Sequence, residues 1–340
     1  MTNTYDGAPS DNGVPSYLRL YETGELERRM SVLVDRLVQC DICPRRCGVD
    51  RTKGELGYCR SPHRVLIASA CAHRGEEPVI SGRRGSGTVF FANCNLRCIY
   101  CQNYEISQRP DLFAGQPGGV GELANVMLHL QDDLRCHNIN LVSPSHFVPQ
   151  ILEALCLAVP RGLRLPLVYN TNAYDSVETL KLLDGIVDVY LPDIKYSSNK
   201  VASRLSGASD YVQVSRDAIR EMHRQVESRL VVDDEGAVRR GLILRHLVLP
   251  GGLAGSEESL RWLASEVSNQ VTIGVMSQYY PVHRAGEISL LGRRVTRQEY
   301  IAAIRVAHDL GFEHLWAQEP GAAAHYRPNF SRDGHPFERV

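Results

Sequence analysis

From residue 88 onward, short apolar segments alternate with longer amphipathic ones, and this alternation restricts the fold more than any other feature. Apolar runs of about four to eight residues bounded by turn residues are typical of buried strands, whereas apolar residues at helical spacing indicate amphipathic helices. Strands that alternate with helices build a parallel sheet covered by those helices, so the sequence predicts an α/β fold. We expect strands at 88–91, 139–143, 166–170, 186–191, 242–249, 271–276 and 313–316.

The helices have recognisable start signals. Thr296 and Glu299 have the spacing of a capping box, in which each side chain satisfies a backbone N–H at the start of a helix. Asp210, with Gln213 three residues later, is placed to cap another helix. Further helices are expected over 25–38, from Ser256, and along the stripe formed by Phe147, Ile151 and Leu155.

Three cysteines with the spacing C-x3-C-x2-C are the strongest sign of chemistry. Cys94, Cys98 and Cys101 can bind three irons of a [4Fe–4S] cluster, which normally takes four cysteines. The fourth iron is then open to bind and activate another molecule. The alternative is that the thiols are packed as small apolar groups. Polar neighbours such as Asn95 and Arg97 argue against this, because they are unusual in a core strand.

The whole cysteine run resembles a known motif. Residues 90–103, FFANCNLRCIYCQN, are similar to the cluster loop of radical S-adenosylmethionine (SAM) enzymes, in the branch described as pyruvate formate-lyase activating enzyme-like. The resemblance implies an oxidoreductase in which SAM binds the open iron of a [4Fe–4S] cluster. It also implies reductive cleavage of SAM to a 5′-deoxyadenosyl radical that abstracts a substrate hydrogen. The cofactors supply that chemistry, while the protein positions them and excludes water.

A fold and a division of the chain follow from the same resemblance. Six or seven strand–helix units are fewer than the eight of a closed barrel, which agrees with a partial (β/α)6-type radical SAM barrel carrying an N-terminal cysteine-rich extension. We expect an N-terminal tail and helix at 1–39, a cysteine-rich segment at 40–87, the partial barrel at 88–320 and a C-terminal tail at 321–340.

Ligands of parallel α/β folds bind at the carboxyl ends of the strands, and here those ends are polar. Ser143 and Ser145 stand where many radical SAM enzymes have a glycine-rich G-G-E that holds the SAM amine, so the amine-binding group stays open. His146 either faces the substrate or belongs to the start of a helix. Asn170 ends the following strand, and either forms a turn or contributes an uncharged amide to the site.

Charged residues follow in the later strands. Asp193 and Lys195 resemble the D-x-K element of glycyl-radical-enzyme activating enzymes, which lies near SAM; a surface ion pair is the alternative. Arg245 lies within an apolar strand and therefore needs a partner or a ligand, and the resemblance implies that it reaches SAM. By the same resemblance Tyr100 lies against the adenine, and Gln278 near the ribose or adenine.

A second cysteine array precedes the first. Its spacing, C-x2-C-x3-C-x11-C, suits a closed zinc site or an auxiliary iron–sulfur cluster, and four free thiols are the third alternative. The array consists of Cys40, Cys43, Cys47 and Cys59, and Cys71 with His73 could complete or replace a ligand. Between the two arrays, Glu76 and Glu77 either line the active site or form a solvated acidic turn.

Composition narrows the partners and the compartment. A formal net charge of −1 over 340 residues gives no electrostatic footprint for nucleic acid, and no apolar run is long enough to span a membrane. The N-terminus lacks a signal-peptide pattern, so 10 cysteines indicate reduced thiols in the cytoplasm rather than disulfides.

Three functions remain open. In the first, the enzyme takes a hydrogen from a glycine of a glycyl-radical protein, with an electron donor such as flavodoxin or ferredoxin. In the second, a radical SAM enzyme modifies another peptide or a small metabolite. The third is a zinc-binding interaction protein, which is disfavoured because a closed zinc site takes four ligands and Cys94, Cys98 and Cys101 offer three.

Overall fold

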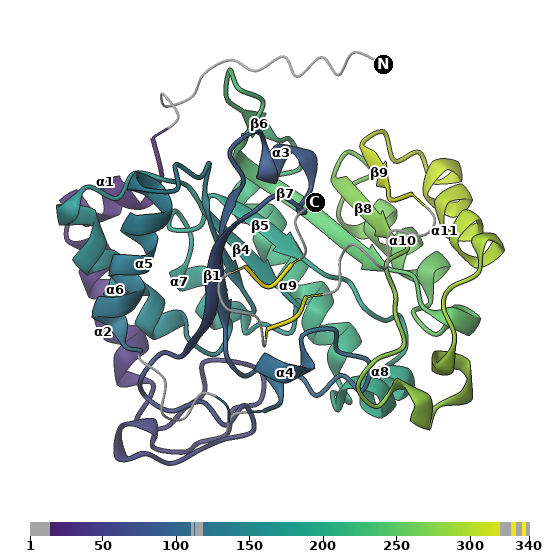
Figure 1. The fold of residues 1–340 in the computed structure, drawn as a ribbon, viewed down its shortest axis with the longest axis horizontal. Helices are drawn as coiled ribbons and strands as arrows, with labels where there is room; N and C mark the ends of the chain where they lie inside the picture. Colours follow the sequence, from purple (N-terminus) through teal and green to yellow (C-terminus); the bar gives the residue numbers. More distant parts are fainter. Residues whose placement is uncertain (1–13, 110–111, 113–117, 320–327, 331–334, 338–340) are drawn as a thin grey trace.

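The computed structural model describes residues 14–109, 112, 118–319, 328–330 and 335–337. Within this part of the chain the strands form one nine-stranded sheet in the order β1-β2-β3-β4-β5-β7-β8-β9, with β6 paired to β7 (Figure 1). The strands are β1 (Ile67–His73), β2 (Ser86–Phe91), β3 (Ile139–Val142), β4 (Leu167–Thr171), β5 (Val189–Pro192), β6 (Val231–Val232), β7 (Val238–Leu247), β8 (Thr272–Met276) and β9 (Leu315–Ala317).

Most of the sheet is parallel, as the sequence predicts. All the pairs from β2 through β5 and from β5 through β7 to β9 are parallel. All seven expected strands are present, with ends that differ by a few residues, and the predicted α/β fold is confirmed. Because parallel strands bring their carboxyl ends to one edge, the polar residues that follow β2, β3, β4 and β5 share that edge.

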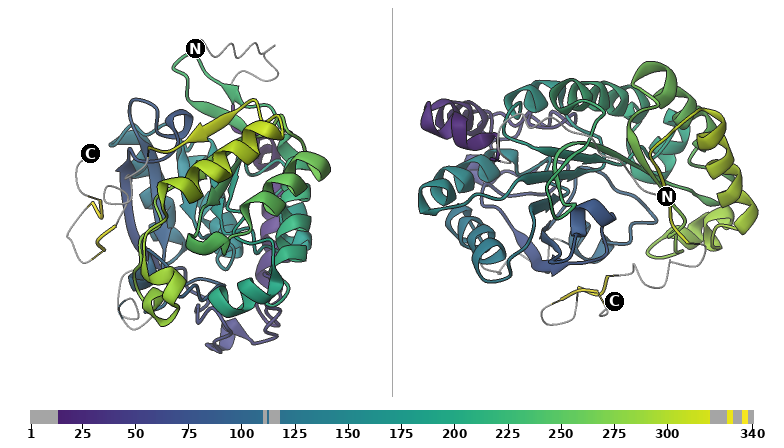
Figure 2. Two further views of the ribbon diagram at one scale, coloured as in Figure 1. Left: turned by 90° about the vertical axis from the view of Figure 1, so that its right-hand side faces the viewer. Right: turned by 90° about the horizontal axis from the view of Figure 1, so that it is seen from above.

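Helices cover the outer face of the sheet, as Figure 2 shows from the side and from above. The main apolar core lies between this face and the helices, and includes Leu141, Tyr190 and Ile219. The helices are α1 (Tyr17–Glu22), α2 (Glu25–Asp35), α3 (Pro78–Ser81), α4 (Tyr104–Ser107), α5 (Val120–Asp132), α6 (Val148–Ala158), α7 (Val177–Leu182), α8 (Asn199–Ser206), α9 (Tyr211–Val226), α10 (Ser256–Glu266) and α11 (Arg297–Asp309).

Two strands were not predicted from the sequence. β1 comes from the cysteine-rich segment and pairs antiparallel with β2, and β6 pairs antiparallel with β7. The sequence of β1, IASACAH, is made largely of small residues, and most of its positions are only partly buried. It therefore lacks the β-branched and aromatic enrichment that marks a strand.

The capping predictions had different outcomes. Thr296 accepts the backbone N–H of Glu299, and the Glu299 side chain accepts the N–H of Thr296, so the predicted capping box is confirmed. Asp210 does occupy the N-cap position of α9, but its side chain caps no backbone N–H. Its carboxylate instead accepts the Tyr174 hydroxyl at 2.6 Å, because that buried tyrosine needs an acceptor.

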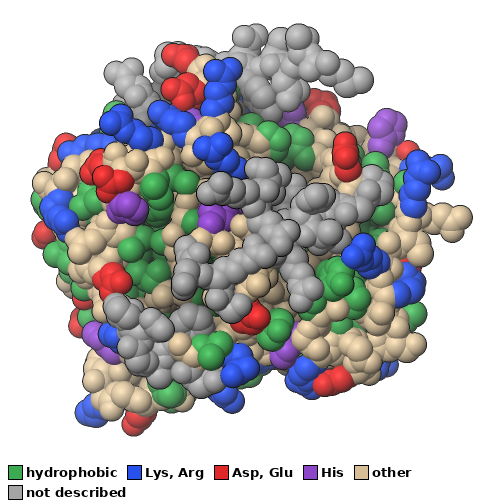
Figure 3. All heavy atoms as spheres, viewed as in Figure 1, with side chains coloured by type: hydrophobic (Ala, Val, Ile, Leu, Met, Phe, Trp, Pro, Cys, Tyr) green, Lys and Arg blue, Asp and Glu red, His purple; other side chains and the backbone are tan. Residues whose placement is uncertain are grey.

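The charge of the surface and the length of the helices are relevant to binding of nucleic acid or membrane. On the face shown in Figure 3, the basic and acidic side chains of the described residues are interspersed. In the described part of the chain, no helix combines the length and the apolar character needed to cross a membrane.

Candidate functional site

A cavity of about 680 Å³ lies at the carboxyl ends of the strands. Such a volume is typical of ligand pockets, which run from about 300 to 1,000 Å³. All three cysteines of the C-x3-C-x2-C run line it, together with polar residues that follow or end β3, β4, β5 and β7. The loops that the sequence set apart by their chemistry therefore meet in one place.

The three thiols lie on the loop between β2 and α4, and each sulfur has a hydrogen-bond donor. Cys94 Sγ accepts the backbone N–H of Leu96 at 3.4 Å and the Asn172 amide at 3.5 Å. Ser206 donates its hydroxyl to Cys98 Sγ at 3.0 Å. The hydroxyl of Ser107 lies 3.3 Å from Cys101 Sγ. Donors of this kind stabilise anionic sulfur, and they tune iron–sulfur clusters.

The chemistry of these residues fits an iron–sulfur cluster. Burial raises the pKa of Cys94, Cys98 and Cys101, so the thiolate form needs a cation beside it. Among the described residues, no three His, Cys, Asp or Glu side chains gather closely enough to hold a metal ion. A cluster of several irons is larger than one ion and spreads its thiolates further apart, so its ligands need not converge on a point.

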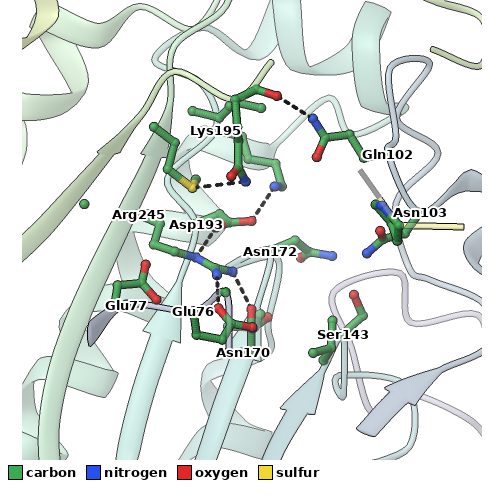
Figure 4. A pocket seen from close by; sticks show the side chains of 18 of the residues that line it. Glu76, Glu77, Gln102, Asn103, Ser143, Asn170, Asn172, Asp193, Lys195 and Arg245 are labelled. Carbon is green, nitrogen blue, oxygen red and sulfur yellow. Dashed lines mark hydrogen bonds and ion pairs between the residues drawn. The ribbon is translucent and has the colours of Figure 1, made fainter. Parts of the chain in front are cut away.

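A chain of ion pairs crosses the cavity beside the thiols (Figure 4). Lys195 Nζ lies 2.6 Å from Asp193 Oδ2, and Asp193 Oδ1 lies 2.9 Å from Arg245 Nε. Arg245 Nη1 lies 3.3 Å from Glu76 Oε2, and Nη2 donates to Asn170 Oδ1. All three nitrogens of the guanidinium are therefore occupied by protein partners, whereas Lys195 uses only one of the three N–H donors of its ammonium group in these contacts.

Burial and ion pairing compete in setting the protonation states. Burial by itself raises the pKa of Asp193, but Arg245 and Lys195 hold it below the ordinary range. Burial lowers the pKa of Lys195, but Asp193 raises it above the ordinary value. Asp193, Lys195 and Arg245 are therefore all charged at neutral pH, as a chain of alternating sign.

The strand ends turn sharply at residues other than glycine. Asn93 after β2, Ser143 after β3 and Ala173 after β4 have φ of 72°, 56° and 61°. A left-handed conformation costs such residues of order 1–3 kcal/mol and persists only where surrounding contacts impose it. These three turns adjoin Cys94, the end of β3 and Asn172, and they are three of the eight described non-glycine residues with positive φ.

Most of the residues proposed from the sequence meet in this cavity. Those that line it are Tyr100, Ser143, Asn170, Asp193, Lys195, Arg245 and Gln278, in addition to the three cysteines. Ser145 does not line the cavity, because its buried hydroxyl lies 3.4 Å from Thr171 Oγ1, within the polar cluster around Asp175. His146 does not face the cavity either, since its Nε2 lies 2.9 Å from the carbonyl oxygen of Ala92.

Several lining residues were missed or left undecided from the sequence. The sequence left open whether Glu76 and Glu77 line the active site or form a solvated acidic turn. Both line the cavity, and so does His73. Trp316 and Phe337 also line it, although nothing in their local sequence indicates a site. The only available signal was the position of Glu76 and Glu77 shortly before the cysteine motif.

The second cysteine array surrounds a much smaller space. A cavity of about 10 Å³, which is room for about one water-sized atom, is lined by Cys40, Cys43, Cys47 and Cys59. Arg51 and His146 line it too, and each has a buried nitrogen that finds no hydrogen-bond partner among the described residues. Cys71 and His73 lie elsewhere: Cys71 packs with Phe90, and His73 lines the large cavity.

The chain is similar to two archaeal proteins. The uncharacterized protein MJ0674 of Methanocaldococcus jannaschii is 30% identical to this chain over 298 residues, which are 86% of this chain and 80% of the relative. The uncharacterized protein MJ0808 of the same organism is 27% identical over 179 residues, covering 48% of this chain and 51% of its own length. No family model matches the chain.

Proposed function

We propose that this chain, which belongs to the same family as the archaeal protein MJ0674, is a radical SAM enzyme that abstracts a hydrogen atom from its substrate. The observation that carries the proposal is the convergence of Cys94, Cys98 and Cys101 on one cavity with Lys195, Asp193 and Arg245. When bound there, a [4Fe–4S] cluster and SAM supply one-electron reduction of the sulfonium and a 5′-deoxyadenosyl radical.

The fold supports the proposal in a general way. Seven parallel strands, with helices on their outer face, place the cysteine loop immediately after β2, the first of them. This arrangement is compatible with the partial barrel that the motif implies, and it leaves β1 and β9 at opposite edges of the sheet. The cavity therefore lies on the side of the sheet that the outer helices do not cover.

Each residue of the ion-pair chain has a distinct role in this proposal. Lys195 pairs only with Asp193 among the described residues, so it has N–H donors left beside the thiols and would receive the carboxylate of SAM. Asp193 accepts one donor from Lys195 and another from Arg245, which keeps the ammonium group in place. Arg245 is a positioning residue, because its contacts with Asp193, Glu76 and Asn170 leave no guanidinium nitrogen without a partner.

Two kinds of substrate could donate the hydrogen atom, a glycyl-radical protein or a small molecule. The motif suggests a glycine in a glycyl-radical protein, which would have to enter the cavity as a loop. One observation favours a small molecule instead: Pro328 and Phe337 of the C-terminal segment form part of the cavity wall. Mixing the loaded enzyme with candidate glycyl-radical proteins and searching for a glycyl doublet by electron paramagnetic resonance separates the two substrates.

The main proposal is tested by reconstituting the protein with iron and sulfide without oxygen, then adding dithionite and SAM. We expect 5′-deoxyadenosine from the wild type and none from Cys98→Ala, which lacks one thiolate ligand. Cys156→Ala is the matched control, since Cys156 lies in α6 and does not line the cavity. A wild-type protein that holds stoichiometric zinc and forms no 5′-deoxyadenosine would exclude the proposal and favour the zinc-binding alternative.

A further inference from the structure

We propose that Glu77 and Trp316 bind a cationic nitrogen group of a small substrate, a protonated amine or a guanidinium, at the end of the cavity away from the cysteines. Calling this ligand the substrate rests on the proposed radical SAM function. The cation site itself follows from the side chains of Glu77, His73 and Trp316.

The position of Glu77 follows from the register of the sheet. Arg245 of β7 pairs with Gly274 of β8, and Gly274 pairs with Trp316 of β9. Residues in register on parallel strands share one face, so these three lie in a row that faces the cavity. Gly274 has no side chain, and a Cβ built there would lie 3.5 Å from Glu77 Oε1. The Glu77 carboxyl group therefore fills the gap between Arg245 and Trp316.

Among the described residues that line the cavity, carboxylates outnumber cationic side chains by one. The cationic residues are Lys195 and Arg245. The carboxylates are Asp193, Glu76 and Glu77. Ion pairs join Lys195 to Asp193, Asp193 to Arg245 and Arg245 to Glu76, so the surplus carboxylate is Glu77. Figure 4 shows Glu77 on the side of Arg245 that faces away from Lys195.

Unsatisfied acceptors accompany the surplus charge. Glu77 Oε2 is buried and makes no hydrogen bond with the described residues. His73 is 6% exposed and lines the cavity, and its Nδ1 has no hydrogen-bond partner in the described part of the chain. Buried polar groups without partners destabilise the protein, and a ligand that donates N–H groups to them would relieve this cost. Burial raises the pKa of Glu77 to about 7, although the nearby charge of Arg245 acts to lower it.

Aromatic rings complete the site. Trp316, Phe90 and Phe337 line the cavity, and the Phe337 ring stacks on His73 with 4.2 Å between ring centroids. A carboxylate combined with an indole face is the arrangement that recognises organic cations, through charge-assisted hydrogen bonds and cation–π attraction.

The test measures binding of n-propylammonium, n-propylguanidinium and uncharged n-propanol to the reconstituted protein, by calorimetry in the presence of SAM. We expect the wild type to bind both cations and to bind propanol no more than weakly. Glu77→Gln keeps the shape but removes the charge, so it should weaken cation binding by about tenfold or more. Trp316→Leu should weaken it by severalfold, and it serves as a second test if Glu77→Gln does not fold.

Glu258→Gln is the matched control, because Glu258 is exposed on α10 and does not line the cavity. Unchanged cation binding in Glu77→Gln, or equal binding of propanol by the wild type, would overturn the proposal. So would loss of SAM affinity in Glu77→Gln, since Glu77 would then belong to the SAM site. A wild type that binds the cations but does not cleave SAM would instead refute the radical SAM function and leave the cation site standing.

Discussion

Arg245 illustrates how a single residue organises the site. The sequence marked it because a charge in an apolar strand needs a partner, and the structure supplies three, Asp193, Glu76 and Asn170. Its side chain is 14% exposed, and those of Glu76 and Asp193 are 11% and 18% exposed. Charges this deeply buried are stable only together, because removing one leaves its partner uncompensated.

Arg245→Met should therefore lower the free energy of unfolding by about 3–5 kcal/mol in urea titrations at neutral pH. Adding Glu76→Gln to this variant should restore part of the loss, since the uncompensated carboxylate is then removed. Arg261→Met is the control: Arg261 and Glu257 form an exposed pair at 2.8 Å, worth about 1 kcal/mol or less. Equal small losses for Arg245→Met and Arg261→Met would contradict the role of Arg245.

His246, the next residue along β7, points away from the cavity and predicts a pH dependence. It is fully buried, with Nδ1 2.8 Å from the Ile194 carbonyl oxygen and Nε2 2.8 Å from Ser256 Oγ. Burial lowers its pKa from 6.5 to about 4. The unfolded chain therefore binds more protons than the folded one between these pH values, and stability falls as the pH falls.

His246→Gln should flatten this part of the pH profile, because a buried histidine that must become charged accounts for about 3 kcal/mol of the loss. Unfolding free energies measured between pH 7 and pH 4 test this expectation, with the exposed His308→Gln as the control. A slope that does not change in His246→Gln would show that other groups carry the acid sensitivity.

Among the elements, those with strong local signals were predicted and those set by distant partners were not. The capping box at Thr296 and the apolar strands follow from neighbouring residues, so their prediction succeeded. The left-handed turns at Asn93, Ser143 and Ala173 are imposed by the packing of adjacent strands, which no local pattern encodes. The capping role of Asp210 was misassigned for a related reason, because Tyr174 competes for its side chain. The Ser145 hydroxyl likewise lies beside Thr171, a contact that its local sequence does not reveal.

The cysteine array of Cys40, Cys43, Cys47 and Cys59 could hold zinc, an auxiliary iron–sulfur cluster or no metal, and the iron content of the protein tests the second alternative. Its four thiols surround room for about one water-sized atom, which is too little for a second iron–sulfur cluster in this arrangement. We expect the reconstituted wild type to hold about four irons per chain, all of them lost in Cys98→Ala. Cys43→Ser should keep that iron, and zinc measured in the same samples separates a zinc site from four free thiols. About eight irons in the wild type would instead show a second cluster.

At the scale of the whole molecule, the C-terminal segment lies against the first two strands of the sheet. Phe330 contacts Phe90 with 5.3 Å between ring centroids, and His335 Nε2 lies 3.3 Å from the carbonyl oxygen of Ala72. Figure 1 shows the described pieces of this segment in front of β1 and the neighbouring strands. Residues more than two hundred positions apart thus share one wall of the cavity, which sequence patterns cannot reveal because they are local.

Phe337→Ala should loosen this wall and expose the thiol of Cys71. Cys71 is 6% exposed and packs with Phe90 and Ile106, and Phe337 lies against this cluster. Burial raises the pKa of Cys71 to about 12, so the covered thiol reacts slowly with alkylating reagents. Losing an aromatic contact worth about 1 kcal/mol or more should raise local opening, and with it the labelling rate, by about fivefold or more.

Peptide mapping after timed iodoacetamide treatment reports each cysteine separately, and Cys156 of α6 is the internal control. Unchanged labelling of Cys71 would mean that the C-terminal segment does not cover this side of the cavity.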